Sequence, residues 1–440
     1  MARLPTFPHG IHPPTHKADT EAARIHQFPF APVLEIPFQQ HTGAPARPVV
    51  REGQEVQRGQ LIAEPDGELS VAMHASASGV IRRIGLMPSA TGAMVEGAWL
   101  VPHPSSTQEI AEGRPCELER ASPEEILEAI RMAGIVGLGG AAFPTHVKLR
   151  IPDDTRVDTL VVNGAECEPY LTADHRVMLE HADDVMTGIG YVRKATGVER
   201  ALIGVEDNKR DAAAALEAAA PADGSVRVQR VAVKYPQGAE KTLIRTLLGR
   251  VVPTGSLPSA VGCVVVNVST LAEIGRLLPR GQGIQERVLT IAGSAVERRG
   301  NYRVPIGTPL RYALEQAGLR EDVSRVFLGG PMMGTALASL DVPITKGTTG
   351  FVALTDPELR SEKRVFPCIG CGYCVDACPQ FLNPARLGLL ARNGEYKEMA
   401  EAHRLADCFE CGACTWVCPS HLPLVQSFRS AKAALKRVPA

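Results

Sequence analysis

Eight of the 11 cysteines stand in two short runs near the carboxyl end of the chain. The first run is Cys368, Cys371, Cys374 and Cys378, followed by Pro379, and the second is Cys408, Cys411, Cys414 and Cys418, followed by Pro419. Both runs read C-x2-C-x2-C-x3-C-P, and they repeat at an interval of 40 residues. Three cysteines at this spacing can turn three thiolates into one tight loop, and thiolates are ligands of soft metal centres. Proline lacks an N–H group and fixes φ, so each proline turns the chain away from its loop.

This spacing holds the two 4Fe–4S clusters of bacterial two-cluster ferredoxins, in which the fourth cysteine of each run ligates the other cluster. We therefore predict two ligand sets: the first set is Cys368, Cys371, Cys374 and Cys418, and the second set is Cys408, Cys411, Cys414 and Cys378. A disulfide framework is disfavoured, because only Cys116, Cys167 and Cys263 lie elsewhere. Zinc sites favour paired C-x2-C units with a spacer. Reduced thiolates predict a cytoplasmic or cytoplasm-facing location.

A second pattern is the glycine-rich run Gly137–Thr145, which reads GLGGAAFPT. Glycines let a backbone approach a ligand closely. Pro144 and Thr145 predict a short helix whose amides would favour a phosphate, with Lys148 adding positive charge. The run follows a predicted helix and lacks G-K-[ST], so it is neither a Rossmann fingerprint nor a P-loop. A phosphate or flavin site and a plain glycine-rich turn both remain open from these residues alone.

Composition limits the class of protein. The chain has 440 residues, 45% of them hydrophobic and 22% charged, which predicts several globular domains. A formal net charge of −1 argues against nucleic-acid binding. The segment Met1–Lys17 lacks the apolar core of a secretory leader, and no apolar stretch approaches the roughly 18 residues of a membrane span. Any work at a membrane is therefore expected to proceed through partners.

The first two predicted domains are residues 1–112 and 113–283. Residues 1–112 alternate short apolar runs with turns and resemble the barrel-sandwich hybrid of biotinyl and lipoyl domains. The tip Pro65–Glu68 has no lysine to modify, which predicts a packing or docking module. In residues 113–283, a helix capped by Ser122 precedes alternating strands and helices, which predicts a mostly parallel sheet covered on both faces. The strands are Thr159–Val162, Ala201–Val205, Val226–Val233 and Cys263–Val268, and the helices are Val177–Thr196, Asn208–Ala220, Ala239–Leu248 and Ser269–Leu278.

Three further regions follow. Residues 284–355 predict a small α+β unit, with strands at Arg287–Gly293 and Arg325–Leu328 around a helix at Pro309–Ala317. A charged linker, Asp356–Arg364, opens the two-cluster domain 356–426, whose runs are joined by a helical connector, Pro384–Ala406. Residues 427–440 form a basic tail with Arg429 and Lys432, for which a solvated helix face is expected. The chain is thus predicted to be a multidomain α/β and α+β protein.

Several segments resemble known families in order. Gly137–Lys148 resembles the flavin loop of the FMN- and NADH-binding subunit of respiratory complex I, and so do Asn163–Pro169, Tyr235–Thr242 and Asn267–Ala272. With GIHPPTHK (Gly10–Lys17), GGPMMG (Gly329–Gly334) and the cysteine runs added, nearly the whole chain resembles the RnfC family of the Rnf complex. The resemblance implies a Rossmann-like FMN/NADH domain, a β-grasp domain of the soluble-ligand-binding (SLBB) type, and a helical two-cluster ferredoxin domain.

The resemblance also implies site residues. FMN is expected near Gly137, Gly139, Gly140, Lys148, Asn163, Gly238, Asn267 and Thr270. The nicotinamide nucleotide is expected at Phe143, Glu166 and Glu168, with Glu240 near the same cleft. Leu138, Ala165 and Ala239 replace an Arg, an Asp and a Glu of the family pattern, so polar contacts are fewer or redistributed. Solvated loop carboxylates remain the alternative for Glu166 and Glu168, and Cys167 is expected to be a packed thiol.

The function implied is that of a peripheral flavin and iron–sulfur subunit of a membrane-bound, ion-translocating NADH:ferredoxin oxidoreductase. Electrons would pass between NADH, FMN and two 4Fe–4S clusters. The resemblance places the protein on the cytoplasmic face of the bacterial inner membrane, beside membrane-embedded and ferredoxin-like subunits. Two alternatives are the cobalamin reductase of bacterial microcompartments, which shares this architecture, and a non-catalytic iron–sulfur relay.

Overall fold

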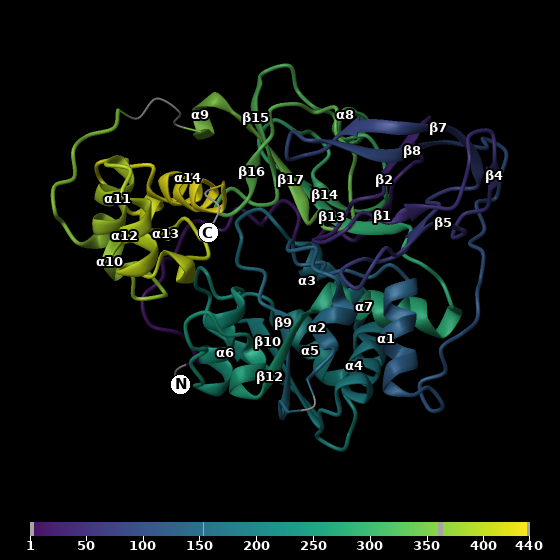
Figure 1. The fold of residues 1–440 in the computed structure, drawn as a ribbon, viewed down its shortest axis with the longest axis horizontal. Helices are drawn as coiled ribbons and strands as arrows, with labels where there is room; N and C mark the ends of the chain where they lie inside the picture. Colours follow the sequence, from purple (N-terminus) through teal and green to yellow (C-terminus); the bar gives the residue numbers. More distant parts are fainter. Residues whose placement is uncertain (1–3, 153, 360–363, 438–440) are drawn as a thin grey trace.

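The computed structural model describes residues 4–152, 154–359 and 364–437, which form four β-sheets and a helical carboxyl-terminal region (Figure 1). Helix α9 covers Asp356–Leu359, at the start of the predicted charged linker. The linker residues 360–363 and the last tail residues, 438–440, lie outside the described residues. None of the helices described has both the length and the apolar character needed to cross a membrane.

The amino-terminal sheets form the predicted barrel-sandwich hybrid. One sheet has the order β2-β8-β7-β4 and the other β3-β5-β6, and Ile36, Ile62 and Leu100 are among the side chains buried between them. The bounds are β2 Leu34–Pro37, β3 Arg47–Pro48, β4 Glu55–Val56, β5 Leu61–Glu64, β6 Met73–His74, β7 Gly79–Pro88 and β8 Met94–Pro102.

The hairpin tip without a lysine packs on the next region of the chain. The carbonyl of Glu68 contacts His146 Nε2 at 3.0 Å, the Glu68 carboxylate pairs with Arg150 at 3.0 Å, and Arg131 donates to the carbonyl of Gly67. His146 and Arg150 belong to the short helix that follows the glycine-rich run and to its carboxyl-terminal cap. These contacts agree with the predicted packing role, because the tip contacts the region that carries the glycine loop.

Residues 159–267 contain a parallel four-stranded sheet with the order β11-β10-β9-β12. Leu160 and Val162 of β9 face a large core shared with α1, α4 and α7, whereas Val161 faces a smaller core shared with α6. Burial on both faces explains the continuous apolar strands. The strands are β9 Thr159–Gly164, β10 Arg200–Glu206, β11 Val226–Val231 and β12 Cys263–Asn267, and the helices are α1 Pro123–Met132, α2 Thr145–Leu149, α3 Ala173–Glu180, α4 Ala182–Thr196, α5 Arg210–Ala219, α6 Glu240–Leu248 and α7 Val268–Leu277.

Two predicted helices of this region, the one capped by Ser122 and the one at 177–196, differ in outcome. The capping box is confirmed, since Ser122 accepts from the Glu125 amide and the Glu125 carboxylate accepts from the Ser122 amide. The predicted single helix 177–196 is wrong. Helix α3 begins earlier and ends at Glu180, because His181 leaves helical geometry with φ −133° before α4 starts. This break lets α3 present its amino-terminal end to the carboxyl edge of the sheet.

The third region is a six-stranded sheet with the order β1-β14-β13-β17-β15-β16, packed against α8. Its edge strand β1, Ile25–Gln27, pairs in parallel with β14. The predicted domain 1–112 therefore includes a strand that belongs to this sheet and not to the barrel. The other bounds are β13 Glu286–Ala292, β14 Gly300–Pro305, α8 Leu310–Gln316, β15 Val323–Leu328, β16 Thr335–Ala336 and β17 Gly350–Thr355.

The cysteine runs lie in a small helical region with α10 Tyr373–Asp376, α11 Pro384–Arg392, α12 Tyr396–Glu401, α13 Ala413–Trp416 and α14 Leu424–Arg437. The predicted boundary at 426/427 cuts through α14, whose Phe428 is buried with Cys374 and Cys414. The expected solvated basic face is also wrong for two residues. Arg429 and Lys432 both pair with Glu410, at 3.0 and 2.9 Å, and so fasten α14 to the second cysteine loop.

Candidate functional site

The glycine-rich run forms a compact exposed turn between α1 and α2. The Gly137 amide donates to the Phe143 carbonyl at 2.8 Å, and the Ala142 amide donates to the Gly137 carbonyl at 3.0 Å. Gly140 has φ +106°, a conformation that a side chain would strain. Within the described chain, the amides of Gly139, Gly140 and Ala141 donate to no protein acceptor. Consecutive free amides in a turn are a setting that binds anions.

The glycine loop faces the carboxyl ends of β9 and β12, and we call the candidate binding region between these segments the glycine-loop cleft. A Cβ at Gly139 would lie 3.3 Å from the side chain of Asn267, so any larger residue would press on it. Asn267 caps α7 by accepting from the Ser269 and Thr270 amides. Thr270 Oγ1 in turn accepts from the Leu138 amide at 2.9 Å. Crevices at the carboxyl edge of parallel sheets are where α/β domains bind ligands.

Asn163, one residue before the end of β9, is in register with Asn267 of β12. Its Nδ2 donates to the Gly238 carbonyl at 2.8 Å, and a Cβ at Gly238 would lie 2.1 Å from the carbonyl of Ala165. The Cys167 sulfur accepts from the Gly238 amide at 3.3 Å, and burial raises the pKa of that thiol, which agrees with a packed role. The structure thus brings together four segments that lie far apart in the sequence.

Lys148 and Glu240 form an ion pair of 2.5 Å across the cleft, with both side chains 36% exposed. Helix α2 has only five residues, and its first amide, from Thr145, donates to Ile135. An anion in this cleft would therefore depend on the loop amides and on Lys148 rather than on a helix end.

Glu166 and Glu168 are half-buried, and their carboxylates accept hydrogen bonds from backbone amides, which argues against the alternative of solvated loop carboxylates. The Glu166 carboxylate accepts from the amides of Asp174 and His175, at 3.0 and 3.3 Å, and so caps α3. The Glu168 carboxylate accepts from the amides of Met332 and Met333, at 3.2 and 2.7 Å. Burial raises the pKa of both groups, that of Glu168 to about 7.

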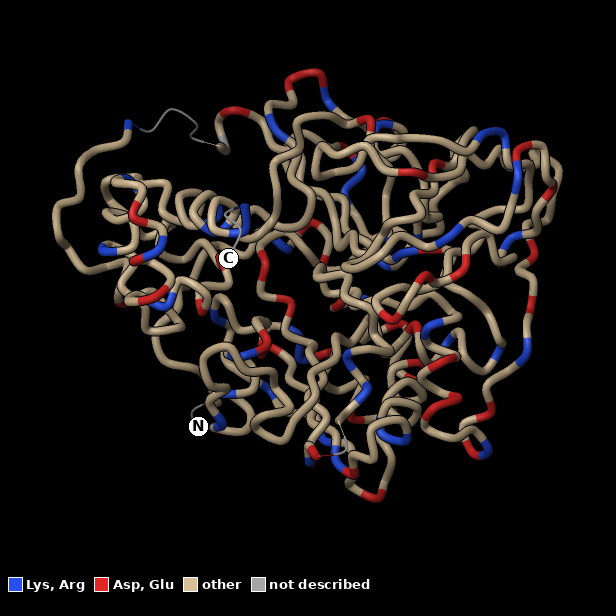
Figure 2. Tube along the Cα trace, viewed as in Figure 1, with Lys and Arg blue, Asp and Glu red and all other residues tan. Residues whose placement is uncertain are grey.

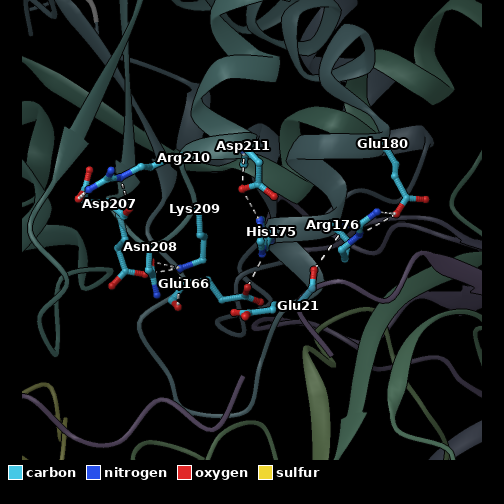
Figure 3. Close-up of polar contacts among 12 residues, drawn as sticks. Glu21, Glu166, His175, Arg176, Glu180, Asp207, Asn208, Lys209, Arg210 and Asp211 are labelled. Atoms are coloured by element: carbon cyan, nitrogen blue, oxygen red, sulfur yellow. Dashed lines mark hydrogen bonds and ion pairs between the residues drawn. The ribbon is translucent and has the colours of Figure 1, made fainter. Parts of the chain in front are cut away.

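Buried charges surround Glu166. Lys209 pairs with Glu206 at 2.7 Å, and Lys17 donates to the carbonyls of Glu166 and Leu171. Figure 3 shows Glu166 between Lys209 on one side and His175 with Asp211 on the other. Glu166 is thus held in place by its own chain, and a contact between Glu166 or Glu168 and a nucleotide stays a prediction. Phe143, expected near the same nucleotide, is half-buried at the end of the glycine loop.

Several supporting residues were not predicted as site residues. Asp174 accepts from Asn267 Nδ2 at 2.7 Å, and buried Arg287 donates to the carbonyls of Leu138 and Thr348. Buried Lys346 donates to the carbonyls of Ala72 and Gly134, at 2.7 and 2.8 Å. It thereby links the six-stranded-sheet region to the barrel and to the segment before the glycine loop. Asp174 lies inside a quoted family motif, but Arg287 and Lys346 carry no local sequence signal. Leu138 is fully buried, so its side chain faces the core rather than a ligand.

The cysteines gather as the two predicted crossed sets. A cavity of about 390 Å³ is lined by all four cysteines of the second set. Burial raises the pKa of Cys414, and its neighbours Cys411, Cys408 and Cys378 raise it further. Burial likewise raises the pKa of Cys374, and Cys371, Cys418 and Cys368 add to that effect. Cys378 and Cys418 therefore lie with the opposite run.

The donor chemistry of these sets fits an iron–sulfur cubane. Among the described residues, no three His, Cys, Asp or Glu side chains converge closely enough to hold one metal ion. A cubane takes one thiolate at each of four iron corners, so its ligands stand farther apart than those of a single ion. A partly open cavity walled by four cysteines and by apolar side chains such as Leu387 and Phe428 meets that need.

The second cysteine loop contacts two segments that adjoin the glycine-loop cleft, at Tyr235 and Met332. Tyr235 Oη donates to the Cys411 carbonyl at 2.6 Å. A Cβ at Gly412 would lie 2.8 Å from the Met332 carbonyl. Met332 is also held by Glu168, so the cleft and the second cysteine loop share one buried junction.

Comparison with known proteins assigns each region. Residues 5–102 match the RnfC barrel sandwich hybrid domain, 130–276 the Nuo51 FMN-binding domain, 288–336 the SLBB domain, and 367–423 the 4Fe–4S dicluster domain. The C subunit of the proton-translocating ferredoxin:NAD(+) oxidoreductase complex of Clostridium ljungdahlii is 43% identical over 91% of this chain and 88% of its own length. This chain belongs to the RnfC family.

Two other relatives show the range of the family. The C subunit of the Na(+)-translocating complex of Acetobacterium woodii is 42% identical, with 87% of this chain and 86% of the relative covered. The corresponding protein of Pseudomonas aeruginosa is 43% identical over 99% of this chain, which spans only 56% of that longer protein. An NAD+-reducing [NiFe]-hydrogenase structure shares the fold, with a TM-score of 0.52 at 20% identity, covering 74% of this chain and 69% of that one. The predicted family, fold class and cofactor types are thereby confirmed.

Proposed function

We propose that this RnfC chain is the NADH-binding flavin and iron–sulfur subunit of a membrane-bound ion-translocating NADH:ferredoxin oxidoreductase. Its work is to pass electrons between NADH, FMN and two 4Fe–4S clusters. The observation that carries the proposal is the junction of Tyr235, Met332 and Cys411, which joins a glycine-loop cleft to a four-cysteine cavity in one chain. When bound, FMN exchanges a hydride with NADH and releases single electrons, and the clusters carry one electron each.

The chain's own residues would hold the flavin as follows. The free amides of the glycine loop and Lys148 would bind the phosphate. Asn163 and Asn267, fixed by Gly238 and Asp174, would line the ring side of the cleft. Glu166 and Glu168 would orient the nucleotide only indirectly, because their carboxylates already hold α3 and the Met332–Met333 amides.

The proposed setting is the cytoplasmic face of the bacterial inner membrane, where membrane-embedded and ferredoxin-like subunits would hold the chain. The relatives named above are all subunits of multi-subunit ion-translocating complexes, which supports this setting. The cobalamin-reductase alternative has no support among these relatives, and the matched FMN-binding domain argues against a relay that lacks flavin.

Absorbance of the anaerobically reconstituted protein tests the proposal. We expect flavin bands at a stoichiometry of about one per chain, bleached by NADH together with part of the iron–sulfur absorbance. A protein with a full iron content that takes up no flavin, or whose flavin NADH leaves oxidised, would contradict it.

A further inference from the structure

The two cysteine loops have the same local fold but opposite surroundings. Gly372 and Gly412 occupy equivalent positions 40 residues apart, with φ +80° and +79°, and each precedes a four-residue helix, α10 or α13. A Cβ at Gly412 would press on the Met332 carbonyl, whereas a Cβ at Gly372 would meet nothing within 4 Å. The second loop is therefore covered by the rest of the chain at a point where the first loop is open.

The side chains of the two loops repeat this contrast. Tyr373 is 58% exposed, but its equivalent Ala413 is 0% exposed against Tyr235 and Met332. Val365 is 54% exposed, whereas its equivalent Leu405 is 1% exposed. At these two positions the first loop thus presents a large apolar side chain where the second has a buried one.

The first loop exposes four large apolar side chains between residues 365 and 373, and the Arg364 guanidinium lies over the ring of one of them, Phe366, at 5.5 Å from the centroid. Val365, Phe366, Ile369 and Tyr373 are 46–70% exposed, and no charged residue lies between Arg364 and Asp376. We call these four side chains the first-loop patch. Figure 1 places α10 on the side of the helical region away from the sheets, and Figure 2 shows the segment that leads into α10 without charged residues and both acidic and basic residues on the helices beside it. Exposed apolar side chains gathered in one short segment are typical of contact surfaces.

We propose that the first-loop patch docks a second protein that carries its own one-electron cofactor, and that electrons leave or enter the chain there. The internal repeat indicates what covers such a loop: the second loop is packed against the region that supplies it with electrons. Cys368 and Cys371 of the first set lie between the patch residues in the sequence and are exposed, so a protein seated there would reach the first cluster directly.

This inference rests on the proposed function, and its test separates the two. The variants are Ile369→Glu and Tyr373→Glu, compared with Leu86→Glu on the barrel, where Leu86 is 60% exposed. Each is assembled in the whole membrane complex. Three quantities are measured: NADH oxidation by ferricyanide, NADH-dependent reduction of a two-cluster ferredoxin, and the EPR signals of both clusters.

We expect both patch variants to keep ferricyanide reduction and to lose ferredoxin reduction by tenfold or more, while Leu86→Glu behaves as wild type. Ferredoxin reduction at the wild-type rate in Tyr373→Glu would overturn the docking proposal, because a carboxylate at the contact cannot be neutral to an apolar interface. If Ile369→Glu loses the EPR signal of the first cluster, its lower ferredoxin reduction reports cluster loss, and Tyr373→Glu alone tests docking. Failure of the wild-type protein to oxidise NADH with ferricyanide would instead count against the proposed function.

Discussion

The cysteine region and the glycine-loop cleft position their ligands in different ways. The eight cysteines lie between residues 368 and 418, and neighbouring turns of chain bring them together. The cleft draws its residues from the α1–α2 loop, the ends of β9 and β12, and the segment before α6. It is braced from behind by the barrel tip and by Lys346. A substitution of one cysteine should therefore abolish one cluster completely. Substitutions around the cleft should instead weaken flavin binding by degrees, and some of them should do so from positions that do not touch the flavin.

The largest expected effect is loss of one cluster. Cys418→Ala removes a thiolate from the first set, although it stands in the second run, so the EPR signal of the first cluster should disappear and that of the second should remain. Iron content should fall from about eight to about four atoms per chain. The matched control is Cys116→Ala, whose thiol lies in neither set. Loss of the second cluster's signal instead would contradict the crossed ligand sets.

The next effect is loss of flavin without loss of iron. Gly139→Val places a branched side chain against Asn267, where even a Cβ would lie at 3.3 Å, and so should keep FMN out of the cleft. Gly85→Val is the control, because a Cβ there makes only ordinary contacts of 3.5 Å or more on β7. Flavin and iron are measured on the same sample. A stoichiometric flavin content in Gly139→Val would place the flavin elsewhere.

A smaller effect should come from Lys346, which lies behind the cleft. Burial lowers the pKa of Lys346 to about 7, from 10.5 in the unfolded chain. The unfolded state therefore binds more protons between these values, and stability should rise as pH increases from about 7 to 10.5. Lys346→Met should remove that rise, and by leaving two buried carbonyls unpaired it should cost about 1–3 kcal/mol at high pH and weaken flavin binding.

The thermal midpoint at pH 6.5, 8 and 9.5 checks this prediction. Lys194→Met is the control, because Lys194 also donates to two carbonyls, those of Leu118 and Glu119, but lies partly in solvent. If the thermal midpoint of Lys346→Met rises with pH as steeply as that of the wild type, Lys346 is not the group responsible for the rise.

The smallest effect concerns the half-exposed ion pair. Lys148→Ala should change the free energy of unfolding by less than about 1 kcal/mol, because exposed pairs contribute little. It should still weaken FMN binding several-fold at low salt, with a smaller loss at high salt. Arg47→Ala, which breaks the exposed pair with Glu64 on the barrel, should leave flavin binding unchanged. Equal FMN affinity in Lys148→Ala and wild type would exclude the phosphate role.

The same contrast explains what the sequence could predict. The cysteine spacing specifies its own ligand sets, because each loop is built from adjacent residues. The parallel sheet was predictable from apolar strands between helices. The break at His181, the strand β1 borrowed by the third sheet and the pairing of Arg429 with Glu410 depend on contacts between distant segments. For the same reason, no local pattern could show that Glu168 is already held by the amides of Met332 and Met333.

The central claim is that electrons from the cleft reach the second cluster first and the first cluster after it. NADH-reduced, freeze-quenched EPR of two variants tests this most directly. With the first cluster removed by Cys418→Ala, the second should still be reduced at the wild-type rate. With the second removed by Cys411→Ala, the flavin should bleach while the first cluster stays oxidised. Normal reduction of the first cluster in Cys411→Ala would contradict the account.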